Sequence, residues 1–267
     1  MSSSTAAETR GRFVWHELLT NDTRAAEAFY KEIVGWKTSK MGDFDYTFWL
    51  AGDTPDTMVG GLTTPPPDAA AMGSAPSWLA YIEVPDADAT ITQAIKLGAK
   101  VLVPAKTMEQ AGRFAVLQDP QGAVFAIITS AQPLAPETDP APRQFSWHEL
   151  ATSDQPAAIS FYQQIFGWEK KSEFDMGAMG SYYMFGRDRF TYGGIMKRPP
   201  EVSTSRWLHY VSVADSADAA AGRAQKAGGT VVLGPMDVPG GDRVAMLSDP
   251  QGAAFAVHSK GTAGKGT

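Results

Sequence analysis

The chain has 267 residues, a formal net charge of −6, 43% hydrophobic residues and 10% aromatic residues. This balance is typical of folded globular proteins and argues against an intrinsically disordered chain. The sequence contains no cysteine, which excludes disulfide bonds, thiolate catalysis and cysteine-ligated zinc.

The sequence also indicates which partners to exclude. Lys and Arg form no basic stripe, so we expect no nucleic-acid partner. No apolar run approaches the roughly 18 residues of a membrane-spanning helix, so we expect no membrane partner. Residues 1–10 are small and polar and lack the apolar segment of a secretory signal. We therefore expect a cytoplasmic protein.

The sequence is an internal duplication. The letters Asp-Pro-Gln-Gly-Ala at 119–123 return at 249–253, and Phe-Val-Trp-His-Glu-Leu at 13–18 returns as Phe-Ser-Trp-His-Glu-Leu at 145–150. A period of about half the chain indicates two paired domains rather than a solenoid. The predicted segments are a tail at 1–11, a first domain at 12–130, a proline-rich linker at 131–143, a second domain at 144–259 and a tail at 260–267.

In the first repeat, Asp22 is a good N-cap and Gly35 a good C′ residue for a helix between them. A second helix is expected over 86–97. The predicted strands are 13–19, 46–51, 58–63, 79–84, 113–118 and 124–128. The Asp-Pro-Gln-Gly turn joins the last two.

The second repeat gives the same order of signals. Asp154 and Gly167 bound its first helix, and its second is expected over 216–227. The predicted strands include 145–150, 182–185, 191–196 and 208–213. Each repeat therefore indicates an α+β fold of paired βαβββ-like units, whose strands curl around a cavity with helices outside.

This pattern resembles the vicinal oxygen chelate superfamily, which includes glyoxalases, bleomycin-resistance proteins and extradiol dioxygenases. The resemblance rests on the helix from Asp22 through Phe29 and Tyr30 to Gly35, on residues 79–98 and on the Asp-Pro-Gln-Gly turn, all of which recur in the second repeat. It implies two fused glyoxalase-like domains. It does not imply one activity, because the family contains enzymes and drug-sequestering proteins.

The resemblance also implies where metal ligands would lie. The matching positions are Trp15, Gly61, Trp78 and Ala126 in the first repeat, and Trp147, Gly194, Trp207 and Ala256 in the second. None of these side chains ligates a divalent cation. We therefore expect no cofactor. The alternative is a divalent metal in a rebuilt site, for which Glu17, Glu149 and His209 are the candidates.

Strand alternation predicts a ligand-binding site. Residues two apart on a strand share a face, so Trp15 shares a face with Glu17, and Trp207 with His209. The candidate ligand-binding residues are Trp15, Glu17, Trp78, Trp147, Glu149, Trp207 and His209. The competing interpretation is that the tryptophans fill cavities that have lost their metal. The paired glycines at 60–61 and 193–194 are expected to bend strands or to give an aromatic ring room to approach.

The leading function predicted is metal-free binding of a small aromatic molecule, as in drug-sequestering members of the family. The alternative is a metal-dependent lyase, isomerase or dioxygenase of glyoxalase type. A third interpretation is a partner-binding protein with filled cavities. The expected partner is a small-molecule ligand, and the expected assembly is a monomer or homodimer.

Overall fold

The computed structural model describes residues 9–40, 42, 45–66, 75–200 and 202–261. Most of the two predicted tails, at 1–11 and 260–267, therefore lies outside the described residues, as does Pro67 in the predicted crossover of the first repeat. Within the described parts of the chain, no helix combines the length and the apolar character needed to cross a membrane.

The first repeat contains the two predicted helices. Its elements are β1 (Phe13–Leu19), α2 (Thr23–Val34), β2 (Lys37–Lys40), β3 (Tyr46–Leu50), η1 (Pro55–Thr57), β4 (Met58–Thr63), β5 (Ser77–Glu83), α4 (Ala87–Lys96), β6 (Lys100–Met108), β7 (Gly112–Gln118) and β8 (Val124–Ser130).

The second repeat has the same order of elements. They are β9 (Phe145–Thr152), α5 (Gln155–Phe166), β10 (Glu169–Asp175), η2 (Gly177–Met179), β11 (Ser181–Arg187), β12 (Phe190–Lys197), β13 (Arg206–Ser212), α6 (Ala217–Lys226), β14 (Thr230–Asp237), β15 (Arg243–Ser248) and β16 (Ala254–Ser259).

The first helix of each repeat is bounded as the sequence predicts. The carboxylate of Asp22 accepts from the backbone N–H of Ala25 at 2.9 Å, and that of Asp154 accepts from Ala157 at 3.0 Å. These contacts satisfy backbone donors that have no partner inside a helix. Each helix ends at a glycine with positive φ, where the missing Cβ removes the steric cost of that conformation.

The strands form two eight-stranded sheets, one from each repeat. Their orders are β2-β3-β4-β1-β5-β8-β7-β6 and β10-β11-β12-β9-β13-β16-β15-β14. In each half-sheet one pair of strands is parallel, such as β1 with β4, and the others are antiparallel. The predicted α+β fold of βαβββ units is confirmed.

The four outermost strands, β2, β6, β10 and β14, were not predicted from the sequence. Each follows a helix, is largely exposed and lies at a sheet edge. An edge strand packs little of its surface, so its sequence lacks the alternation that marks a half-buried strand. The predicted order of elements was wrong at these four places.

The compact units of the chain differ from its repeats. Unit 1 consists of Met1–Val14, Ala80–Asp139 and Trp147–Leu208, and unit 2 of Trp15–Leu79, Pro140–Ser146 and His209–Thr267. Each unit thus combines one half of the first repeat with the opposite half of the second. Because of the duplication, each half of one repeat has an equivalent half in the other repeat. Combining halves from different repeats therefore preserves the kind of packing.

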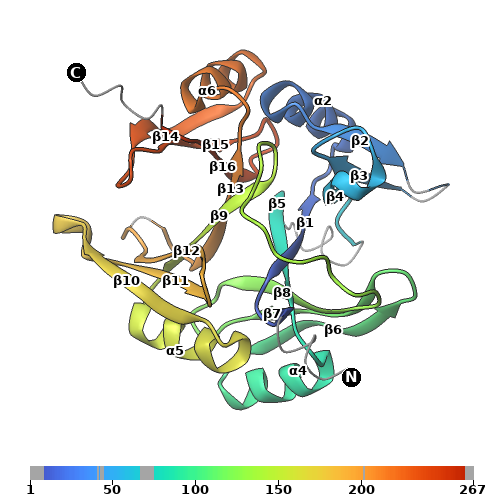
Figure 1. The fold of residues 1–267 in the computed structure, drawn as a ribbon, viewed down its shortest axis with the longest axis vertical. Coiled ribbons are helices and arrows are strands. Elements are labelled where there is room, and N and C mark those ends of the chain that lie inside the picture. The colour runs from blue at the N-terminus through green and yellow to red at the C-terminus, as the bar shows by residue number, and fades with distance from the viewer. Residues whose placement is uncertain (1–8, 41, 43–44, 67–74, 201, 262–267) are drawn as a thin grey trace. The chain divides into compact units, whose positions relative to one another are not determined.

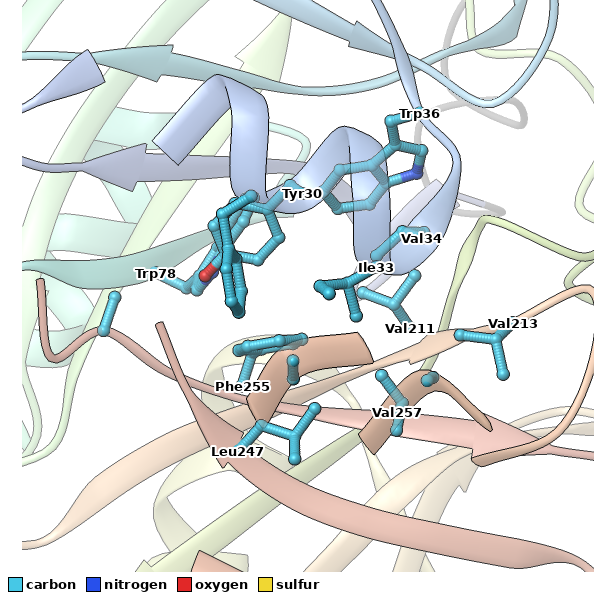
Figure 2. Close-up of a cluster of buried hydrophobic side chains, with 14 of the residues drawn as sticks. Tyr30, Ile33, Val34, Trp36, Trp78, Val211, Val213, Leu247, Phe255 and Val257 are labelled. Carbon is cyan, nitrogen blue, oxygen red and sulfur yellow. The ribbon is translucent and has the colours of Figure 1, made fainter. Parts of the chain in front are cut away.

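The core of unit 2 lies between α2, α6 and the strands that they cover (Figure 1). Figure 2 shows Tyr30 and Ile33 of α2 pointing toward Phe255 of β16. The ring centroids of Tyr30 and Phe255 are 5.0 Å apart in an edge-to-face contact, which is a favourable arrangement for aromatic rings. Trp36 is also buried in this core.

The core of unit 1 has an equivalent arrangement around α4 and α5. Phe161 and Tyr162 of α5 are buried, as predicted, and both contact Phe125 of β8 edge to face. Trp168, just after α5, is also buried and its indole N–H donates to the backbone oxygen of Gly11 at 2.8 Å. A helix of one repeat therefore covers strands of the other.

Candidate functional site

Unit 2 contains a cluster of Trp15, Tyr46 and Glu17, which we call cluster A. The indole N–H of Trp15 donates to the hydroxyl of Tyr46 at 3.0 Å, and this hydroxyl donates to Oε1 of Glu17 at 2.9 Å. Trp15 and Glu17 share one face of β1, as alternation predicts, whereas Leu18 points into the core. The three cluster side chains are half-buried.

Unit 1 repeats this arrangement with Trp147, Tyr182 and Glu149, which we call cluster B. The Trp147 indole donates to the Tyr182 hydroxyl at 2.9 Å, and the hydroxyl donates to Oε2 of Glu149 at 2.9 Å. Trp147 and Tyr182 are half-buried, and Glu149 is buried. The same polar cluster is thus built twice, from equivalent strands.

Glycines at the positions opposite the two glutamates leave room for the tyrosine rings of clusters A and B. In the sheet register Glu17 is opposite Gly61, and Glu149 is opposite Gly194. A Cβ on Gly61 would lie 2.0 Å from the Tyr46 hydroxyl oxygen, and one on Gly194 would lie 2.0 Å from the Tyr182 ring. Each tyrosine therefore lies across a glycine, which matches the expectation that the paired glycines give a ring room.

Electrostatics keep the tyrosine hydroxyls protonated. Burial raises the pKa of Tyr46, and the negative charge of Glu17 raises it further. Burial also raises the pKa of Tyr182, and the negative charge of Glu149 raises it further. A protonated hydroxyl can accept from the indole and donate to the carboxylate at the same time. Each cluster therefore fixes an indole, a phenol and a carboxylate in one orientation.

Trp78 and Trp207 lie elsewhere: Trp78 is buried in the core of unit 2, and Trp207 is half-buried against the core of unit 1. In unit 2 the Trp78 indole donates to the Tyr30 hydroxyl at 2.9 Å, and that hydroxyl donates to Asp249 at 3.2 Å. In unit 1 Trp207 donates to Tyr162 at 3.3 Å, and Tyr162 donates to Asp119 at 2.8 Å. The two aspartates are those of the repeated Asp-Pro-Gln-Gly turns.

Within each unit, the structure places the predicted ligand-binding residues in separate groups. It joins Trp15 with Glu17 and Trp147 with Glu149, whereas Trp78 and Trp207 contact the buried tyrosines of the helices. Ligand binding by any of the seven stays a prediction, which the experiments below address.

His209 is also buried, and it lies beside a second histidine of unit 2. Its ring contacts that of His16 edge to face, with centroids 5.2 Å apart, and a ring nitrogen of each lies within 4.8 Å of the other. Burial lowers the pKa of His209 to about 3. His16 also stacks on Phe145, at 3.6 Å between centroids. In unit 1, His148 stacks on Phe13 in the same way.

The sequence prediction did not include Tyr46 and Tyr182. A signal was present, because a tyrosine occurs near the start of the equivalent strand in both repeats, before the paired glycines. What the sequence could not show was that each tyrosine side chain crosses the neighbouring glycine strand and bonds the glutamate on the strand beyond it.

A surface hollow of about 300 Å³ lies in unit 1, lined by Ser153, Lys197, Arg198 and Pro200. None of these four residues is a predicted site residue. The candidate site is therefore defined by clusters A and B, on the strength of their repeated hydrogen bonds, and not by this hollow.

The comparisons with known proteins cover both repeats. The sequence model of the Glyoxalase/Bleomycin resistance protein/Dioxygenase superfamily matches residues 12–127 and 144–257. The chain belongs to this superfamily. It is 31% identical over 245 residues to "Putative glyoxylase CFP32" of Mycobacterium tuberculosis, covering 91% of this chain and 92% of that protein.

One further relative and one solved structure extend the comparison. The chain is 28% identical over 264 residues to "Anthracycline biosynthesis protein DauV" of Streptomyces sp. strain C5, covering 92% of each protein. It shares its fold with the Mn(II)-bound glyoxalase from Novosphingobium aromaticivorans, with a TM-score of 0.64 and 16% identity over 94% of this chain and 82% of that one. The resemblance inferred from the sequence is confirmed.

The metal site that the family resemblance implies does not fit the residues present. The indole N–H of Trp15 and the hydroxyl of Tyr46 are hydrogen-bonded to each other, and the Tyr46 ring lies across Gly61. Ala126 is fully buried and carries no donor atom. The same is true of Trp147, Tyr182, Gly194 and Ala256 in the second repeat. The tryptophans and tyrosines provide aromatic surface there, and the glycines and alanines provide no ligand atom in their side chains.

Proposed function

We propose that the protein binds a small aromatic molecule against clusters A and B, without a metal at the positions that the family resemblance implies. The observation that carries this proposal is that the same Trp–Tyr–Glu cluster is built in both units, with matching hydrogen bonds. A packed core does not require a half-buried indole and phenol in a hydrogen-bonded series that ends on a carboxylate.

The chemistry of the clusters suits a flat ligand that carries a cationic or hydrogen-bond donor group. An indole offers a large rigid face for stacking and attracts cations through its ring quadrupole. The glutamate adds a hydrogen-bond acceptor, and its charge when ionised, at the edge of that face. A mostly apolar surface with a few oriented polar groups is typical of small-molecule sites.

Two observations support this class of ligand. Relatives of the chain are named for anthracycline biosynthesis, and an anthracycline contains fused aromatic rings. The superfamily name includes bleomycin resistance protein. We infer that this protein sequesters or carries such a compound.

Tryptophan fluorescence tests the proposal. We expect planar aromatic compounds that carry an amine to quench the emission of the full-length protein saturably, because a ring stacked on Trp15 or Trp147 alters its excited state. Replacing both residues with Phe should remove most of the quenching. Trp207→Phe is the matched control, because it changes a half-buried indole that donates to Tyr162 of α5 and belongs to neither cluster.

Two results would reject the proposal. The first is a panel in which no compound quenches saturably. The second is quenching that survives the double replacement of Trp15 and Trp147 but is lost in Trp207→Phe, which would move the ligand to the helix side of the sheet.

A second candidate function is a metal-dependent lyase, isomerase or dioxygenase that uses a different site. The observation that favours it is the buried pair His16 and His209, whose ring nitrogens lie within 4.8 Å of each other. Neutral imidazole is the form that binds metals, and the low pKa of His209 keeps it neutral. The pair supplies two of the three protein ligands that catalytic sites typically use.

Metal analysis separates the two candidates. The leading proposal predicts that ligand binding is unchanged after dialysis against a chelator. The second predicts about one divalent metal ion per chain after purification, lost in a His16→Ala and His209→Ala double variant and retained in His258→Ala. His258 is a suitable control because Ser146 and Asp242 already contact its two nitrogens. Stoichiometric metal together with chelator-sensitive binding would overturn the leading proposal.

A further inference from the structure

Unit 2 contains a hydrogen-bonded series of a serine, a histidine and an aspartate that the proposed function does not use. Oγ of Ser146, on β9, lies 2.9 Å from Nδ1 of His258, on β16. Nε2 of His258 lies 2.8 Å from Oδ2 of Asp242, in the turn before β15. All three side chains belong to unit 2, where they come from two of its chain segments.

Asp242 determines which nitrogen of the imidazole carries the proton. The N–H of Gly261 donates to the second oxygen of Asp242 at 3.0 Å. Burial by itself would raise the pKa of Asp242, but the Gly261 N–H and His258 outweigh it and lower the pKa. An ionised carboxylate can only accept hydrogen bonds. When the His258 imidazole carries a single proton, Nε2 therefore donates to Asp242 and Nδ1 accepts from the Ser146 hydroxyl.

The series occurs in only one repeat. The equivalent positions in the first repeat hold Val14, Gly112 and Ile128, none of which has a polar side chain. The first repeat forms the same strands with these residues. The fold therefore does not require the polar series, and all three positions differ together.

The serine and histidine are also within reach of a small reagent. Ser146 is half-buried, and the side chains of His258 and Asp242 are 17% and 38% exposed. A hydroxyl that bonds a neutral imidazole, with a carboxylate on the far nitrogen, is the arrangement that activates a serine for attack on a carbonyl.

We propose that Ser146 is a nucleophile toward small carboxylic esters, with His258 as its general base and Asp242 as a positioning residue. Oγ forms a bond to the carbonyl carbon while its proton moves to Nδ1 of His258. The ester C–O bond then breaks, and the departing alcohol takes that proton. Water attacks the acyl-serine by the same route, which releases the acid and restores Ser146.

Labelling with a fluorophosphonate probe tests the proposal on the full-length protein. The probe phosphonylates activated serines with loss of fluoride, so intact mass gives the stoichiometry and peptide mapping gives the site. We expect one adduct per chain, on Ser146, and turnover of a p-nitrophenyl ester. Ser146→Ala should abolish both, whereas Ser39→Ala, which changes an exposed serine of β2, should leave both intact.

The labelling rates of further variants test the roles of His258 and Asp242. His258→Gln should slow labelling by about 100-fold or more, the usual contribution of a general base. Asp242→Asn should slow it in a protein whose thermal unfolding is unchanged, and Asp242→Glu should restore part of the rate. Absence of an adduct on Ser146 in the folded wild-type protein would overturn the proposal, as would equal labelling rates in wild type and His258→Gln.

Discussion

Replacing Phe161 with Ala is expected to lower the free energy of unfolding by about 3–5 kcal/mol. Phe161 is 4% exposed and contacts Phe125 and Tyr162 edge to face in the core of unit 1. The substitution removes the buried ring and leaves a cavity, because helix α5 cannot collapse onto the sheet without moving its other core residues.

Denaturant titration followed by circular dichroism measures this effect. Phe174→Ala is the matched control, since that ring is 41% exposed on the edge strand β10 and should change stability by less than about 0.5 kcal/mol. A cost below about 1 kcal/mol for Phe161→Ala would show that α5 does not hold the two halves of unit 1 together as described.

Gly193→Ala is expected to destabilise unit 1 by about 3 kcal/mol or more, at the upper end of the usual cost of overpacking. A Cβ at this position would lie 1.7 Å from the backbone oxygen of His148, on the paired strand β9. Backbone cannot rotate away as a flexible side chain can, so β9 and β12 would have to separate.

The same measurement with Gly222→Ala provides the control. That glycine lies in helix α6, and no atom within 4 Å opposes an added Cβ. Alanine favours helix more than glycine does, so this variant should gain up to about 1 kcal/mol. Equal stabilities for the two variants would contradict the register in which Gly193 lies opposite His148.

The sequence predicts most of this fold because its signals are local. Helix caps at Asp22 and Asp154 and the alternating inner strands depend on neighbours in the chain. The edge strands β2, β6, β10 and β14 escape prediction because most of their residues are exposed, so their sequences lack the regular apolar–polar alternation that marks a half-buried strand. The sequence also does not predict that each unit combines halves of different repeats, because equivalent halves present equivalent surfaces.

The site was predictable only in part. Alternation correctly places Trp15 and Glu17 on one face of β1. The same rule gives no information on which side of the sheet Trp207 faces, and in the structure its indole reaches the helix residue Tyr162. Tyr46 could be identified as a site residue only from its contact with Glu17 on another strand. That contact depends on how the strands pair, which the sequence of a single strand does not specify.

Calorimetric titration of chelator-treated protein with a planar aromatic amine tests the central claim most directly. The comparison is between wild type, the double variant Glu17→Gln and Glu149→Gln, and Glu173→Gln, which removes a charge from the exposed strand β10. If the clusters bind the ligand, the double variant should lose at least about tenfold in affinity, or roughly 1.4 kcal/mol, while Glu173→Gln matches wild type. An affinity unchanged in the double variant would contradict the claim.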